Sequence, residues 1–91
     1  MEHRILFSNI RRLIALDELH EANPQNVDFK NSLATSYLFL GQHYKNNLNE
    51  LETARHYIQK GYELYEQLVR DFPDYHMFRK NYEWAKAQLG L

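Results

Sequence analysis

The sequence has no cysteine, and it has little proline, glycine or net charge. Without cysteine there is no disulfide, no thiolate metal site and no cysteine nucleophile. Eleven Lys and Arg against twelve Asp and Glu leave a net charge of −1, which gives no basic footprint for nucleic acid or an anionic membrane. The longest charge-free stretch, Asn31–Tyr44, includes polar residues and is too short to span a bilayer. We therefore expect no nucleic-acid partner and no membrane partner.

The sequence also lacks the motifs of targeting and of catalysis. Arg4, Arg11 and Arg12 interrupt the N-terminal apolar run, which is unlike a signal peptide, and we expect a cytoplasmic protein. There is no glycine-rich phosphate loop and no Gly-x-Ser-x-Gly. The five histidines have no metal-binding spacing; His43 and His56 flank one turn, but two imidazoles alone make a poor metal site. We expect no enzyme, and no catalytic, metal-binding or cofactor-binding residues.

Apolar residues make up 44% of the chain and aromatic residues 14%, which is enough for a folded domain. Only three glycines and two prolines are present, so long helices are expected. No segment alternates with a period of two, which argues against strands. Asn- and Pro-rich turns divide the chain into four predicted helices, at roughly 3–22, 26–46, 49–71 and 75–90. The predicted fold class is all-α.

The apolar residues of these segments follow helical spacing. In 49–71 they recur at steps of three and four along one stripe: Leu51, Ala54, Ile58, Gly61, Tyr65, Leu68 and Phe72. The first segment is apolar almost all round, from Ile5 to Leu19. A helix with more than one apolar face usually lies between neighbours.

The chain resembles itself when it is shifted by 49 residues. Pro24 then falls on Pro73, and Phe29 falls on Phe78. Leu40–Gly41 likewise falls on Leu89–Gly90. This pattern predicts an internal repeat. The alternative is two unrelated helices that each follow a proline, because helix starts look alike.

Within this repeat, Tyr37-x2-Leu40-Gly41-x2-Tyr44 is similar to the aromatic-x2-Leu-Gly-x2-Tyr signature of tetratricopeptide repeats. Ala54-x3-Ile58-x2-Gly61 is similar to the small-x3-large-x2-small pattern of that family's second helix. The resemblance implies an antiparallel helix-hairpin stack, a segment of an α-solenoid with about four helices. Gly41 is then expected where the second and third helices cross, because a glycine lets two helices approach closely.

The period of 49 departs from the family's usual length of about 34 residues. Lengthening both helices of the hairpin by two turns, with one more residue in the loop between them, accounts for the difference. Each repeat of the family has a first and a second helix, and the four predicted helices correspond, in chain order, to a second, a first, a second and a first helix. We therefore interpret residues 1–91 as a single tetratricopeptide-like helical domain, expected to be a fragment or the C-terminal end of a longer array.

The resemblance also implies where a partner binds, because first helices line the concave face of such arrays. The corresponding positions are Asn31, Thr35, Leu38, Gln42, Lys45, Lys80 and Trp84. For Trp84 the alternative is packing against the third helix. The family's best-known clamp for a terminal carboxylate uses Lys and Asn, but Leu38 and Gln42 stand at the corresponding positions.

Two hypotheses follow. The leading one is a non-catalytic protein–protein interaction module, a scaffold that binds a peptide or another domain on its concave face. The alternative is a self-assembly element that forms a homodimer through the N-terminal helix. The residues expected in that dimer are Leu6, Phe7, Ile10, Leu13 and Ile14.

Overall fold

The structure is a computed structural model that describes the backbone of residues 2–91 and the side chains of residues 7–91. It contains four helices: α1 (Glu2–Ala22), α2 (Val27–Asn46), α3 (Leu51–Asp71) and α4 (His76–Gln88). Residues 2–91 include no strand, so the predicted all-α class is confirmed. Each helix begins and ends within two residues of its predicted bounds.

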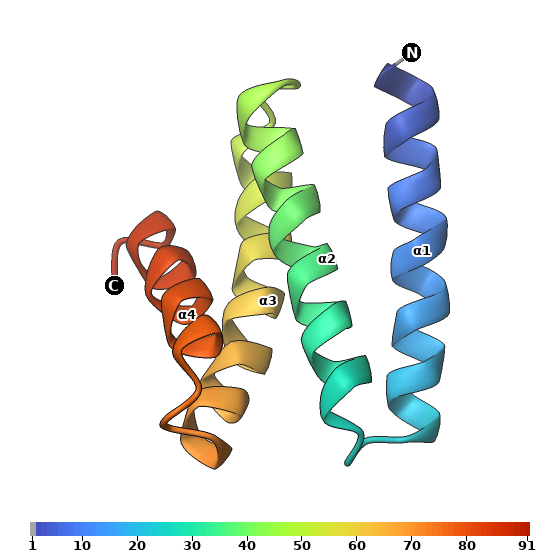
Figure 1. Cartoon of the computed structure of the whole chain (residues 1–91). Helices are drawn as coiled ribbons and strands as arrows, with labels where there is room; N and C mark the ends of the chain where they lie inside the picture. Colours follow the sequence, from blue (N-terminus) through green and yellow to red (C-terminus); the bar gives the residue numbers. More distant parts are fainter. Residues whose placement is uncertain (1) are drawn as a thin grey trace.

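Consecutive helices run in opposite directions, and α1 and α4 lie on either side of the α2–α3 pair (Figure 1). The molecule measures 37 × 31 × 18 Å along its principal axes, so it is a flat stack of helices. Among residues 7–91, Arg70 and Asp71 form the one ion pair within 4.0 Å, and both side chains are exposed. Packing and hydrogen bonds, rather than ion pairs among these residues, therefore hold the four helices together.

The two proline turns have the same backbone hydrogen bonds when the chain is shifted by 49 residues. The amide of Asn23 donates to the carbonyl of Leu19 at 3.0 Å, and the amide of Phe72 donates to that of Leu68 at 2.8 Å. One turn further, the amides of residues 26 and 75 donate to the carbonyls of residues 23 and 72 at 3.0 and 3.1 Å. The sequence repeat is therefore also a repeat of backbone conformation. The residues at the N-caps differ, because the side chain of Asn26 caps α2 whereas Tyr75 gives α4 no side-chain cap.

Two residues in the left-handed region lie at the two helix boundaries that differ from the predicted ones by two residues. Asn49 has φ = 53°, which Asn tolerates better than most residues, and α3 therefore begins at Leu51. Gly90 has φ = 75° and ends α4, while the amide of Leu91 donates to the carbonyl of Lys86 at 3.0 Å. This αL glycine is a common way to satisfy the last carbonyls of a helix.

The crossing of α2 and α3 is built from two glycines in reciprocal positions. A Cβ atom on Gly41 would overlap Cγ1 of Ile58 and lie 3.1 Å from the carbonyl oxygen of Ala54. A Cβ atom on Gly61 would lie 2.6 Å from Cδ2 of Leu38 and 3.1 Å from the carbonyl oxygen of Ala34. Both helices therefore present Ala-x3-large-x2-Gly to each other. The predicted place of Gly41 at this crossing is confirmed.

Buried side chains form two clusters, and the larger one includes the crossing residues Ala34, Leu38 and Ile58. The larger cluster joins α2, α3 and α4 and includes Tyr65, Leu68 and Phe78. The smaller one joins α1 and α2 through Leu13, Leu33 and Leu40. Two ends of the predicted α3 stripe lie outside both clusters: Leu51 is 60% exposed and Phe72 is 42% exposed. They stand at the two ends of α3, beyond the crossing with α2.

Candidate functional site

Residues of α2 line two hollows, one on the side of α4 and one on the side of α1. The first hollow, of about 260 Å³, lies between α2 and α4, and the buried Tyr65 of α3 is part of its lining. Four of the predicted concave positions line it: Thr35, Leu38, Gln42 and Trp84. The remaining lining residues are Phe39, Tyr65 and Asn81.

The floor of this hollow is a hydrogen-bond network around the hydroxyl of Tyr65. The ring of Tyr65 is fully buried. Its hydroxyl donates to Oδ1 of Asn31 at 3.1 Å, accepts from Nδ2 of Asn81 at 3.0 Å and lies 2.6 Å from Oγ1 of Thr35. Burial raises the pKa of Tyr65, and the hydrogen bonds with Thr35 and Asn81 act in the opposite direction. The network joins α2, α3 and α4 at one point, so it gives the hollow a fixed polar floor.

Trp84 lies where both of its predicted alternatives would place it. It is half-buried and packs against the larger core cluster, and it also lines the hollow. Leu38 differs from its predicted role as a partner contact on an exposed face. It is only 8% exposed, because its side chain fills the space that Gly61 leaves open. Leu38 is thus a core residue whose edge reaches the floor of the hollow.

The predicted lysines lie outside this lining. Lys45 is exposed at the end of α2, and its Nζ donates to Oε1 of Gln88, which links α2 to α4. Lys80 is exposed on α4. Asn31 is half-buried and acts through the tyrosine network. The structure therefore brings five of the seven predicted residues together at this hollow: Asn31, Thr35, Leu38, Gln42 and Trp84. The two lysines lie outside its lining.

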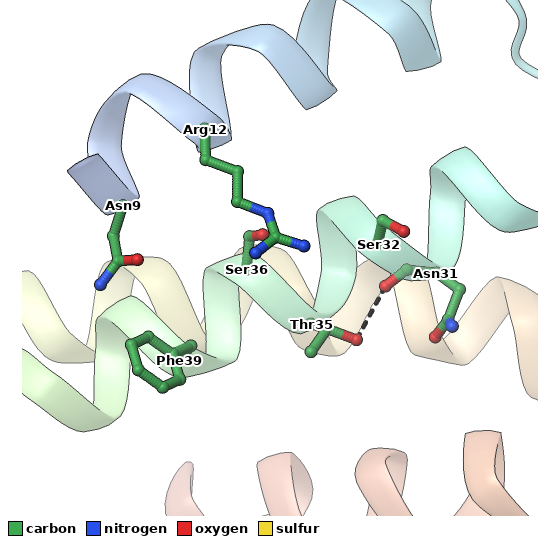
Figure 2. Close-up of a pocket in the computed structure, with 7 residues that line it drawn as sticks. All are labelled: Asn9, Arg12, Asn31, Ser32, Thr35, Ser36 and Phe39. Carbon is green, nitrogen blue, oxygen red and sulfur yellow. Dashed lines mark hydrogen bonds between the residues drawn. The ribbon is translucent and has the colours of Figure 1, made fainter.

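The second hollow, of about 360 Å³, lies between α1 and α2, and no motif in the sequence indicates it. It is lined by Asn9, Arg12, Asn31, Ser32, Thr35, Ser36 and Phe39 (Figure 2). The guanidinium group of Arg12 points from α1 toward Ser36 of α2 (Figure 2). Within residues 7–91, no carboxylate lies within 4 Å of this guanidinium group. The Nδ2 atom of Asn9 is buried and has no hydrogen-bond partner.

Thr35 and Phe39 line both hollows, so the two form one continuous surface along α2. Phe39 is 54% exposed although it is large and apolar. Among the described residues, no Asp or Glu lines either hollow, and Arg12 supplies a positive charge. The surface therefore offers an exposed aromatic ring, several hydrogen-bonding groups and one cation. A ligand here would meet apolar, hydrogen-bonding and positively charged groups side by side.

The residues predicted for self-association differ in how exposed their side chains are. Phe7 and Ile14 are 62% and 54% exposed on α1. Ile10 is half-buried, and Leu13 is 8% exposed because it packs against α2 in the smaller core cluster. Leu13 is therefore a core residue rather than part of an open face. The side chain of Leu6 lies outside the described residues.

Within the part of the chain that the structure describes, no three His, Asp or Glu side chains are grouped as metal ligands. His43 is buried, and its Nδ1 lies 2.8 Å from Nδ2 of Asn47. None of the described helices is long and apolar enough to cross a membrane. The chain matches none of the family models, curated proteins or solved structures with which it was compared.

Proposed function

We propose that the chain is a non-catalytic interaction module that binds an extended peptide segment of a protein along α2. The observation that carries the proposal is the continuous surface formed by the two hollows, with Phe39 exposed at their junction. Exposed aromatic side chains next to arginine and amide groups are typical of protein-binding surfaces. An extended peptide has backbone amides and carbonyls along its whole length, and the amide and hydroxyl groups of the two hollows are suitable partners for them.

The rigidity of the surface supports the same proposal. The tyrosine network holds α2 and α4 at a fixed separation, so the hollow between them is formed before a ligand arrives. A preformed surface loses less conformational entropy on binding than a mobile one. Arg12 adds a preference for an acidic residue in the peptide, because no carboxylate of residues 7–91 neutralises it.

The resemblance to tetratricopeptide repeats is part of this proposal. It is supported by the glycines at the α2–α3 crossing and by the repeated backbone hydrogen bonds of the two proline turns. In such arrays the surface of the first helices is the one that binds partners, and α2 and α4 are those helices here. We also propose a cytoplasmic location, and the binding proposal does not depend on it.

The proposal is tested by selecting peptides from a random display library on the immobilised chain. A selected peptide is then titrated against the wild type, Phe39→Ser and Leu51→Ser. Both substitutions remove a large exposed apolar side chain, but Leu51 lies at the start of α3, outside both hollows. We expect Phe39→Ser to weaken binding at least about tenfold, as for a central interface residue, and Leu51→Ser to leave it unchanged. Equal losses in both variants, or a library that yields no binder, would contradict the proposal.

A further inference from the structure

The face of α1 that points away from α2 carries one stripe of exposed residues. Large or charged side chains recur along it at steps of four, three and four: Phe7, Arg11, Ile14 and Glu18. Ala15 and Ala22 lie beside this stripe and are also exposed. Among residues 7–91, α1 packs mainly along α2, so this outer stripe has no neighbour within the chain.

The two charges of the stripe have opposite signs, and neither has a partner of opposite charge among residues 7–91. No carboxylate of residues 7–91 lies within 4 Å of Arg11, whose guanidinium group instead lies 5.7 Å from the ring centre of Phe7. Glu18 likewise has no cation within that distance among the described residues. The two residues are separated by two helical turns, or roughly 10 Å along the axis, which is too far for a direct ion pair.

We propose that this stripe pairs with the same stripe of a second copy of the chain, in antiparallel orientation. A two-fold axis between Ile14 and Ala15 places each Arg11 opposite Glu18 of the second copy, and the symmetry forms this ion pair twice. The same axis places Ile14 beside the small Ala15 of the second copy and Phe7 beside its Ala22. Large side chains thus meet small ones, and opposite charges meet each other.

The charges also select this orientation over the parallel one. In a parallel pair, Arg11 would face Arg11 and Glu18 would face Glu18, and both contacts repel. The contact is one helix against one helix, which is smaller than the interfaces of permanent dimers. A reversible dimer that forms at high protein concentration is the result. It uses a surface distinct from the hollows along α2, so its test is independent of peptide binding.

The test is a set of charge reversals followed by analytical ultracentrifugation over a range of concentrations. For the wild type we expect an apparent mass that rises from one chain toward two as concentration increases. Arg11→Glu and Glu18→Arg should each remain at the mass of one chain, because each places like charges opposite each other. An equimolar mixture of the two variants should associate again, because one variant then carries two acidic groups and the other two basic groups at these positions.

Two controls separate this pairing from general effects of charge. Glu63→Arg reverses an exposed charge on α3 and should associate as the wild type does. Ile14→Glu removes an apolar contact of the stripe and should remain at one chain. Circular dichroism checks that each variant keeps its helices. A wild type at the mass of one chain throughout overturns the dimer, and failure of the two charge variants to associate when mixed overturns the antiparallel register.

Discussion

The glycine crossing makes a quantitative prediction at Gly41. Replacing Gly41 with alanine improves helix propensity by about 1 kcal/mol. The added Cβ atom, however, overlaps Cγ1 of Ile58 and lies 3.1 Å from the carbonyl oxygen of Ala54. Overpacking of this kind costs about 1–3 kcal/mol, and we expect the upper part of that range because a backbone oxygen moves only with its helix. The net prediction for Gly41→Ala is a loss of about 1–2 kcal/mol in the free energy of unfolding.

Urea unfolding followed by circular dichroism measures this loss, and a double-mutant cycle identifies its cause. Ile58→Ala alone should cost about 2–5 kcal/mol because it leaves a cavity. The double variant lacks Cγ1 of Ile58, so the new Cβ atom of residue 41 no longer meets it. The measured loss of stability in the double variant should therefore be smaller than the sum of the two single-variant losses, by at least about 0.5 kcal/mol. Gly90→Ala is the control, because Gly90 has φ = 75° and a Cβ atom added there would meet no atom within 4 Å. Its cost therefore comes from backbone strain and should add to that of Ile58→Ala. A Gly41→Ala variant more stable than the wild type would refute the close crossing.

Three further predictions concern buried groups. Tyr65→Phe leaves Asn31 and Asn81 without their hydroxyl partner, and we expect a loss of about 1–2 kcal/mol in urea unfolding. Leu13→Ala should lower stability by about 2–5 kcal/mol, whereas Ile14→Ala should change it by less than about 1 kcal/mol, because only Leu13 is buried. Stability should fall as pH rises above about 10, because burial raises the pKa of Tyr65 in the folded chain above its unfolded value and ionisation then favours unfolding. A free energy of unfolding that stays constant above that pH would contradict the burial of its hydroxyl.

Tyr62 also contributes to the expected loss of stability at alkaline pH. A hydrogen bond with Tyr82, together with burial, raises the pKa of Tyr62 to about 12. The two hydroxyl oxygens are 3.4 Å apart, and the rings are stacked with their centres 5.2 Å apart. This stabilisation is fully present below about pH 10 and is lost between there and about pH 12. Phenolate absorbance during alkaline titration should therefore show tyrosines that ionise later than the exposed ones.

The fold was largely predictable because local chemistry determines it. Proline and asparagine mark the turns, and the three-and-four spacing of apolar residues marks the helices. Gly41 was placed correctly because a glycine inside a periodic helix usually has a packing reason. The helix ends were less accurate at Asn49 and Gly90, where a residue in the left-handed region sets the boundary.

The candidate site was only partly predictable, because neighbouring positions of one helix face differ in burial. Thr35 and Gln42 border the hollow, but Leu38 between them turns toward Gly61 and is buried. Leu13 and Ile14 are adjacent in sequence, and only the approach of α2 decides which of them is buried. The hollow beside Arg12 depends on how two helices pack, and no spacing within either helix reveals that.

The most direct test of the proposed function is a titration of the isotope-labelled chain with a selected peptide, followed by nuclear magnetic resonance. If the peptide lies along α2, the amide signals that shift should belong to the residues around the two hollows, including Ser36, Phe39, Gln42 and Asn81. Signals from the exposed face of α3, such as that of Glu63, should stay in place. Shifts confined to α3 or to the outer stripe of α1, with none near Phe39, would contradict the proposal that this surface binds the peptide.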